Sequence, residues 1–383
     1  MKILNIVGAR PNFVKIAPLI REMQKYSDLS SVLVHTGQHY DVKMAGQFFQ
    51  DLQIPEPDIS LEVGSGSHAY QTAEVMKRLE PVLAMERPDL VLVVGDVNST
   101  LAAALTAAKL CIPVAHIEAG LRSLDRTMPE EINRLVTDTV SEYLFVSEES
   151  GRQNLLREGV AESKIHFVGN VMIDSLEASR RSWECSDIHN RFGLKRGEYG
   201  IVTLHRPSNV DDALTLQGLT EALTIIATHL PVIFPMHPRT TARITEFGLQ
   251  KHFQSLVPHS AFCIPHLTPN TLHPQLYCLD PLGYLDFMAL VADARLVLTD
   301  SGGLQEETTA LGIPCLTLRE NTERPVTVTH GTNRVVGMSP EKIVQEACKV
   351  LTDSTQVSVR PPLWDGRTSQ RIVAILREQS QGS

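Results

Sequence analysis

The stretch from residue 91 to residue 134 alternates apolar runs with a helical pattern, and this alternation restricts the fold of the whole chain. Two apolar runs, VLVVGD (91–96) and PVAHIEAG (113–120), are separated by an alanine-rich segment (99–109). Two short apolar runs joined by a helix are typical of a βαβ unit, whose parallel strands are buried on both faces. The sequence therefore predicts an α/β fold with parallel sheets.

Acidic residues end both of these runs. Asp96 and Glu118 follow them, and Glu131 lies in the PEE segment that begins the next helix. Ligands of such sheets bind beyond the carboxyl ends of the strands, so we expect these three side chains in one cleft. Neighbouring carboxylates raise each other's proton affinity and can keep an acid and a base ready near neutral pH. Each acid alone could equally cap a helix, but the three together favour catalysis.

The length and composition of the chain indicate two domains. Its 383 residues suffice for two domains of about 150–200 residues each. A polar, irregular segment predicts a boundary near residues 170–190, after which the alternation of strands and helices starts again. We expect an N-terminal domain of residues 1–170 plus a C-terminal helix (366–383), and a second domain of residues 171–365.

Composition also restricts the partners. The net charge of −9 without a basic stripe argues against a nucleic-acid binder, because such proteins present a basic surface. The sequence contains no apolar stretch of membrane-spanning length, and its first residues lack the apolar core of a signal peptide, so we expect a cytoplasmic protein. The six scattered cysteines form no CxxC pair and indicate neither a zinc ribbon nor a disulfide framework.

Cations and glycines mark expected anion sites. Arg10 and Lys15 lie at the start of the first helix, whose N-terminus attracts negative charge. In the second half, a DSGG turn separates a strand from a helix, and its glycines allow a phosphate to approach the backbone. Glu306 or Glu307, one turn further, is expected to bond ribose hydroxyls, and Arg319 and Arg324 lie in the loop that follows.

Two further predicted strands, both in the second half of the chain, end on histidines. His205 and His237 follow apolar runs of the second half and are therefore candidate ligand contacts.

Residues 251–280 are rich in proline and histidine and lack a regular period, and their histidines and cysteines fit no zinc pattern. We expect an extended surface insertion there, and no metal site.

Motifs along nearly the whole chain resemble the non-hydrolysing UDP-N-acetylglucosamine 2-epimerase family. The matching stretches are GARPNFVK, HTGQHYD, GDVNST, HIEAGLRS, PEEINR, VGN, PLGYLDF, DSGGLQEE and RENTERP. The resemblance implies a glycosyltransferase-B-like fold, in which two Rossmann-like domains face a cleft. It also implies a homodimer, a UDP-sugar substrate and a reaction without a nicotinamide or other cofactor.

The resemblance further implies a mechanism and roles for individual residues. A base removes the proton at sugar carbon 2 while UDP leaves carbon 1, giving a 2-acetamidoglucal to which UDP is added again with a proton on the other face. The implied catalytic residues are Asp96, Glu118, Glu131 and His205. The implied substrate-binding residues are Arg10, Lys15, Arg134, His237, Ser301, Gly302, Gly303, Glu307 and Arg324.

The sequence leaves other functions open. Where many bacterial relatives have THRREN and HxNP, this chain reads LHRPSN and HPRT, so we do not expect activation by a second substrate molecule. One alternative is an epimerase of a modified UDP-sugar such as a diacetamido-uronate. A glycosyltransferase of the same fold is a second alternative, although it needs fewer acids in the cleft. A catalytically inactive UDP-sugar sensor is the third.

Overall fold

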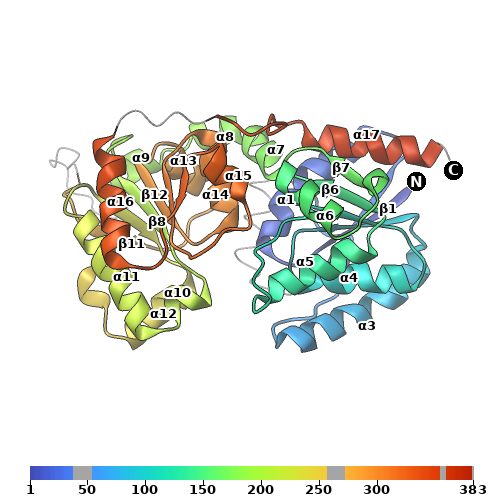
Figure 1. The fold of residues 1–383 in the computed structure, drawn as a ribbon, viewed down its shortest axis with the longest axis horizontal. Helices are drawn as coiled ribbons and strands as arrows, with labels where there is room; N and C mark the ends of the chain where they lie inside the picture. Colours follow the sequence, from blue (N-terminus) through green and yellow to red (C-terminus); the bar gives the residue numbers. More distant parts are fainter. Residues whose placement is uncertain (38–53, 257–271, 354–358, 382–383) are drawn as a thin grey trace. The chain divides into compact units, whose positions relative to one another are not determined.

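The chain forms two compact units, Met1–Ala178 with Pro362–Ser383, and Ser179–Pro361. The computed structural model describes residues 1–37, 54–256, 272–353 and 359–381. Each unit contains one seven-stranded sheet with helices packed around it (Figure 1). Within the described ranges, no helix combines the length and apolar character needed to cross a membrane.

The sheet of the first unit is entirely parallel, in the order β3-β2-β1-β4-β5-β6-β7. Its strands are β1 (Lys2–Val7), β2 (Ser30–His35), β3 (Ile59–Ser60), β4 (Leu90–Val94), β5 (Val114–Ile117), β6 (Tyr143–Val146) and β7 (Ile165–Phe167). Every residue of the central strand β4 is buried, as the uninterrupted apolar run predicts for a strand covered on both faces.

Helices surround this sheet. They are α1 (Arg10–Met23), α3 (His68–Glu86), α4 (Asn98–Lys109), α5 (Pro129–Val140), α6 (Glu149–Arg157), α7 (Val171–Ala178) and α17 (Thr368–Gln381), with the 3₁₀ turn η1 (Glu162–Lys164). The last helix returns to the first unit, where it contacts α1 and α7 (Figure 1). Asp174 on α7 holds the beginning of α17, because its carboxylate accepts from the backbone N–H groups of Thr368 and Ser369 at 3.0 and 2.7 Å.

The sheet of the second unit is also parallel, in the order β10-β11-β9-β8-β12-β13-β14, with β11 between β9 and β10. Its strands are β8 (Gly200–Thr203), β9 (Val232–Pro235), β10 (Gln254–Ser255), β11 (Leu276–Leu279), β12 (Leu296–Thr299), β13 (Cys315–Thr317) and β14 (Asn333–Val335). Its helices are α8 (Arg180–Glu184), α9 (Ile188–Phe192), α10 (Pro207–Val210), α11 (Ala213–Ile226), α12 (Pro238–Glu246), α13 (Tyr284–Ala292), α14 (Gly302–Leu311), α15 (Pro325–Thr329) and α16 (Pro340–Thr352), with the turn η2 (Gln250–His252).

The stretch expected to be a surface insertion contributes two strands to this sheet. β11 pairs along its whole length with β9, and β10 pairs with β11. The strand β11 was missed because a four-residue run, LYCL, is too short to show the alternation typical of a strand when prolines flank it. Three of its four residues are buried. Residues 257–271 of this stretch, which include His259, Cys263 and His266, lie outside the described residues, and so do residues 38–53, which include the end of the HTGQHYD motif.

Candidate functional site

Each sheet has a point at which the order of its strands reverses. In the first unit this point lies between β1 and β4, and in the second between β8 and β12. Loops that leave such a point diverge to opposite sides of the sheet, and the crevice between them is where open α/β sheets bind ligands. Asp96 follows β4, His205 follows β8, and Ser301 follows β12, so the topology places predicted site residues at both reversal points.

Arg134 joins two of the predicted carboxylates in the first unit. Its guanidinium lies 2.5 Å from Asp96 Oδ2 through Nη1 and 2.5 Å from Glu131 Oε2 through Nη2. Glu131 also accepts from the backbone N–H of Ser123 at 2.9 Å and of Leu124 at 3.0 Å. Arg134 and Glu131 are almost fully buried, whereas Asp96 keeps 27% of its side chain exposed and is the member open to a ligand.

The third carboxylate, Glu118, forms a buried ion pair with Lys15 of α1. This pair lies against the turn that precedes Asp96. A β-carbon on Gly95 would stand 3.2 Å from Lys15 Nζ and 3.8 Å from Glu118 Oε2, so the absence of a side chain there makes room for the pair. Glu118 itself has a positive φ of 72°, an unfavourable conformation for a residue with a side chain. The structure therefore brings Asp96, Glu118 and Glu131 together at one edge of the sheet.

The expectation that these carboxylates raise each other's proton affinity is wrong for Glu131. Burial favours its neutral form, but the guanidinium of Arg134 and the donors of Ser123 outweigh burial and hold its pKa below the usual range. The pKa of these acids depends also on the cations that folding places between them, and those cations are distant in sequence. Arg134 and Lys15 each contact a carboxylate, so the cluster contains both signs of charge.

Sequence reasoning missed two asparagines that support these loops. Asn12 accepts from the backbone N–H of Gly8 and Ala9 at 3.1 and 2.9 Å and donates to the carbonyl of Val94 at 2.9 Å. Asn133 donates to the backbone carbonyl of Asp96 at 2.8 Å. Both belong to motifs quoted above, GARPN and PEEINR, but their role depends on long-range contacts. Arg10 begins α1, and the placement of its side chain lies outside the described residues.

In the second unit, His205 is held by a buried carboxylate that sequence reasoning missed. Its Nδ1 lies 2.8 Å from Oδ1 of Asp300, which is fully buried, while 45% of the His205 side chain is exposed. The other Asp300 oxygen accepts from the backbone N–H of His205 and Arg206 at 2.9 Å each. Burial opposes ionisation of Asp300, but His205 and these donors lower its pKa. Asp300 ends an apolar run as Asp96 does, so the expectation that ligand contacts follow the carboxyl ends of strands applies to it as well.

An arginine cluster lies at the N-terminus of α14. Arg324 contacts Glu323 at 2.8 Å and Glu306 at 2.9 Å, and Arg319 contacts Glu323 at 2.9 Å. A β-carbon on Gly302 would collide with the guanidinium of Arg324, so this glycine is needed to bring that cation to the helix N-terminus. Ser301, Gly302 and the next residue, Gly303, are partly accessible. Backbone N–H groups, a helix N-terminus and arginines are groups with which proteins commonly bind anions.

Glu307 and His237 occupy different environments. Glu307 is 5% exposed, and Tyr284 donates to its Oε1 at 3.2 Å. Burial, helped by the charge of Glu306 and opposed by the Tyr284 hydroxyl, raises the pKa of Glu307 to about 8.

His237 is exposed and begins α12, where its Nδ1 accepts from the backbone N–H of Arg239 at 3.2 Å. Its ring centroid lies 6.4 Å from that of His205.

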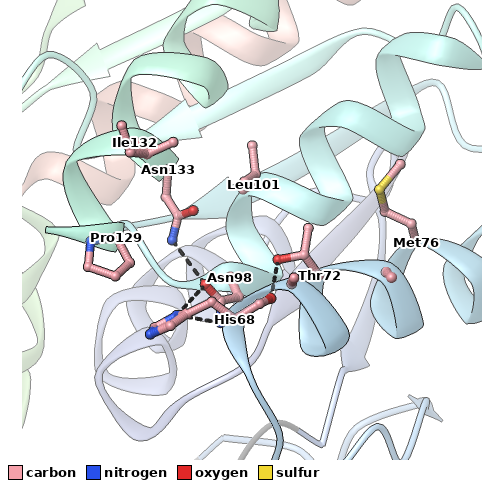
Figure 2. A pocket seen from close by; sticks show the side chains of 10 residues that line it. His68, Thr72, Met76, Asn98, Leu101, Pro129, Ile132 and Asn133 are labelled. Carbon is pink, nitrogen blue, oxygen red and sulfur yellow. Dashed lines mark hydrogen bonds between the residues drawn. The ribbon is translucent and has the colours of Figure 1, made fainter. Parts of the chain in front are cut away.

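A cavity of about 430 Å³ lies among α3, α4 and α5 (Figure 2). Its lining, taken from the described part of the chain, is mostly apolar and includes no predicted site residue. Figure 2 shows Asn98 in this lining, hydrogen-bonded to His68 and to Asn133. Across the described ranges, histidine, cysteine, aspartate and glutamate side chains form no group of three placed to hold a metal ion.

Two parallel α/β units, one with an acid cluster and the other with arginines at a helix N-terminus, define a nucleotide-sugar enzyme of the glycosyltransferase-B-like fold class. The family model for UDP-N-acetylglucosamine 2-epimerase matches residues 21–377. The chain belongs to this family, and it is an isomerase.

Individual relatives match the chain over almost all of its length. A UDP-N-acetylglucosamine 2-epimerase of Methanocaldococcus jannaschii is 41% identical, covering 98% of this chain and 99% of its own. A UDP-2,3-diacetamido-2,3-dideoxy-D-glucuronate 2-epimerase of Pseudomonas aeruginosa is also 41% identical over 98% of this chain and 99% of its own. The crystal structure of the M. jannaschii enzyme with UDP-GlcNAc and UDP has a TM-score of 0.87 and 40% identity, and the match covers 99% of this chain and 100% of that one.

Proposed function

We propose that this enzyme interconverts UDP-N-acetylglucosamine and UDP-N-acetylmannosamine. The observation that carries the proposal is the convergence of Asp96, Glu118 and Glu131 at the reversal point of the first sheet, next to Lys15 and Arg134. Inverting a carbon centre that bears a weakly acidic hydrogen requires groups that remove a proton and return one. A solved relative contains UDP-GlcNAc and UDP, which supports the substrate.

The reaction begins with an elimination. A carboxylate of the first unit takes the proton from sugar carbon 2, and the electron pair of that C–H bond forms a double bond between carbons 1 and 2. The C1–O bond breaks, and its electron pair leaves with UDP, giving 2-acetamidoglucal. In the second step the UDP oxygen bonds to carbon 1 again while carbon 2 receives a proton on the opposite face. Atoms and electrons balance without an oxidant or a reductant.

The second unit provides groups suited to the leaving diphosphate. We assign the N-terminus of α14, with Ser301 and Gly302, and Arg324 to the diphosphate oxygens. Asp300 accepts from Nδ1 of His205 and stabilises the imidazolium, and when the ring is protonated its Nε2 donates toward the negative charge that develops as the C1–O bond breaks. Glu307 is assigned to the ribose hydroxyls. Neither unit requires a bound cofactor for these roles.

Incubation with UDP-N-acetylglucosamine in deuterated water tests the proposal. Mass and NMR spectra are expected to show the second epimer and deuterium at carbon 2 of both sugars. A glycosyltransferase would require an acceptor and would leave the hydrogen at carbon 2 in place, and a sensor would bind UDP without either change. Absence of both epimer and deuterium contradicts the proposed function.

A UDP-diacetamido-uronate is the second candidate substrate. It is favoured by one observation, since the P. aeruginosa relative is as similar in identity as the archaeal one. Comparing kcat/KM for the two substrates separates the candidates. A higher value with UDP-N-acetylglucosamine supports the first, and a higher value with the uronate replaces it.

We further propose that the enzyme is a cytoplasmic homodimer, as the family resemblance suggests. Light scattering of the purified protein is expected to give the mass of two 42.4 kDa chains, and the mass of one chain contradicts the dimer. Fractionation of the source cells checks the location.

A further inference from the structure

We propose that a buried cluster of His116, Asp138 and Arg122 positions the catalytic carboxylates, and that both ring nitrogens of His116 carry a hydrogen in it. His116 lies within β5, and Asp138 lies near the end of α5. Neither residue is placed in contact with substrate, so both are positioning residues. The effect on turnover rests on the proposed function, whereas the charge state of His116 does not.

The charge of His116 follows from its two partners. The side chain is fully buried, with Nδ1 2.6 Å from Asp138 Oδ1 and Nε2 2.8 Å from the backbone carbonyl oxygen of Gly95. Both partners are acceptors only, because one is an ionised carboxylate and the other a carbonyl. Each ring nitrogen must therefore carry a hydrogen for both bonds to form, and an imidazole with two N–H groups is a cation.

The charges around Asp138 agree with this assignment. Its second oxygen lies 2.7 Å from Arg122, which also reaches Glu158 through two hydrogen bonds of 2.8 and 2.7 Å. With His116 charged, two cations face two carboxylates. With a neutral ring the cluster would hold an excess negative charge around a buried aspartate, an arrangement that is costly to bury. Burial opposes ionisation of Asp138, but His116 and Arg122 outweigh it and lower its pKa.

Asp138 connects the segments that carry the catalytic acids. It accepts from the backbone N–H of Gly120 at 3.0 Å, two residues beyond Glu118. Through His116 it reaches the carbonyl of Gly95, the residue before Asp96. Its own helix, α5, carries the third acid.

These turns need support from outside because their backbones are strained or unusual. Gly95, Glu118 and Gly120 all have positive φ angles, of 69°, 72° and 79°. Such conformations persist where surrounding contacts hold them, and small displacements of reacting groups can cost about 100-fold in rate. The bond from His116 to Gly95 is thus the contact expected to matter most for turnover.

Two substitutions separate the two bonds of His116. The amide nitrogen of asparagine stands near the position of Nδ1, and that of glutamine near Nε2. His116→Asn therefore keeps the donor to Asp138 and loses the donor to Gly95, whereas His116→Gln keeps the donor to Gly95. We expect kcat to fall about 100-fold in His116→Asn and about tenfold or less in His116→Gln, with KM within about threefold of wild type in both.

A matched control and a spectroscopic readout complete the test. His166→Asn removes a histidine that packs on Phe145 in the same unit, and it is expected to change kcat by less than about twofold. Long-range ¹⁵N–¹H spectra of the wild type at about pH 8, above the usual histidine pKa of about 6.5, are expected to show one imidazole with hydrogens on both nitrogens. That signal should vanish in His116→Asn and His116→Gln.

The outcomes are distinct. A buried imidazole that lacks one ring hydrogen overturns the assignment of charge, and equal losses of kcat in the two variants overturn the positioning role. The spectrum requires no substrate, so it remains readable if the wild type fails to exchange hydrogen at carbon 2. That failure would contradict the proposed function alone.

Discussion

His205 and Asp300 form a histidine–carboxylate pair in which Nδ1 of His205 lies 2.8 Å from Oδ1 of the fully buried Asp300. The two residues follow β8 and β12, the neighbouring strands at the reversal point of the second sheet. A carboxylate at Nδ1 fixes the orientation of the ring and the position of its hydrogens, and it stabilises the imidazolium. His205 therefore differs from an ordinary surface histidine in being held in one orientation.

Asp300→Asn is expected to lower kcat by about 100-fold, because an amide nitrogen cannot accept the hydrogen of His205 Nδ1. The amide oxygen can still accept from the backbone N–H groups of His205 and Arg206, so the fold should persist. Steady-state rates across pH check the prediction. Asp293→Asn is the control, since Asp293 also faces a histidine, His189, at 3.4 Å in the same unit but lies outside the proposed site. Equal losses in the two variants would contradict a role for the pair in turnover.

Asp96→Asn is expected to reduce epimerisation by at least about 100-fold while UDP binds within about threefold of wild type. Asp96 belongs to the acid cluster, whereas the diphosphate is assigned to the second unit. Asp89 precedes the same strand β4 and is exposed at its opposite end, so Asp89→Asn serves as the control and should retain full activity. Turnover and calorimetric titration with UDP measure the two quantities. Loss of UDP binding in Asp96→Asn would assign Asp96 to binding.

Gly302→Ala is expected to weaken UDP binding by about tenfold or more, because the new β-carbon would occupy the place of the Arg324 guanidinium. The displaced atoms are the end of a flexible side chain, so the protein should still fold. Gly218→Ala, in helix α11 of the same unit, places a β-carbon 3.1 Å from Pro340 and is the matched control. Calorimetry with UDP measures both variants, and unchanged affinity in Gly302→Ala would remove Arg324 from the diphosphate site.

The pKa of about 8 at Glu307 predicts how stability depends on pH. The unfolded carboxyl titrates near 4.5, so between 4.5 and 8 the native state holds a proton that the unfolded state has released. The unfolding free energy should therefore fall as pH rises through this window, by on the order of 1 kcal/mol per pH unit relative to Glu307→Gln.

Fluorescence separates the two units in this measurement. The chain has two tryptophans, with Trp183 in the second unit and Trp364 in the first, so a Trp364→Phe background reports urea unfolding of the second unit. Glu320→Gln, at an exposed glutamate of the same unit, is the control. Identical pH slopes with and without Glu307 would show that its carboxyl is ionised in the native state.

Much of the fold was predictable because it depends on local patterns. The apolar run at 91–96 predicted a buried strand, and β4 is buried at every residue. The run LYCL was missed, because four apolar residues beside several prolines carry too little periodicity to separate a strand from a loop. Asp300 was missed although the rule that identified Asp96 applies to it equally.

The sequence by itself determined the parallel α/β architecture, the acids that follow β4 and β5, and the glycine turn before α14. These depend on periodicity and on the position of a residue relative to a strand end, which are local properties of the chain. Only the tertiary structure decided the charge of the cluster, because Lys15 and Arg134 reach Glu118 and Asp96 from distant positions in the sequence. Electrostatic interactions depend on distance in space, so a carboxylate's proton affinity follows from the cations that folding places beside it.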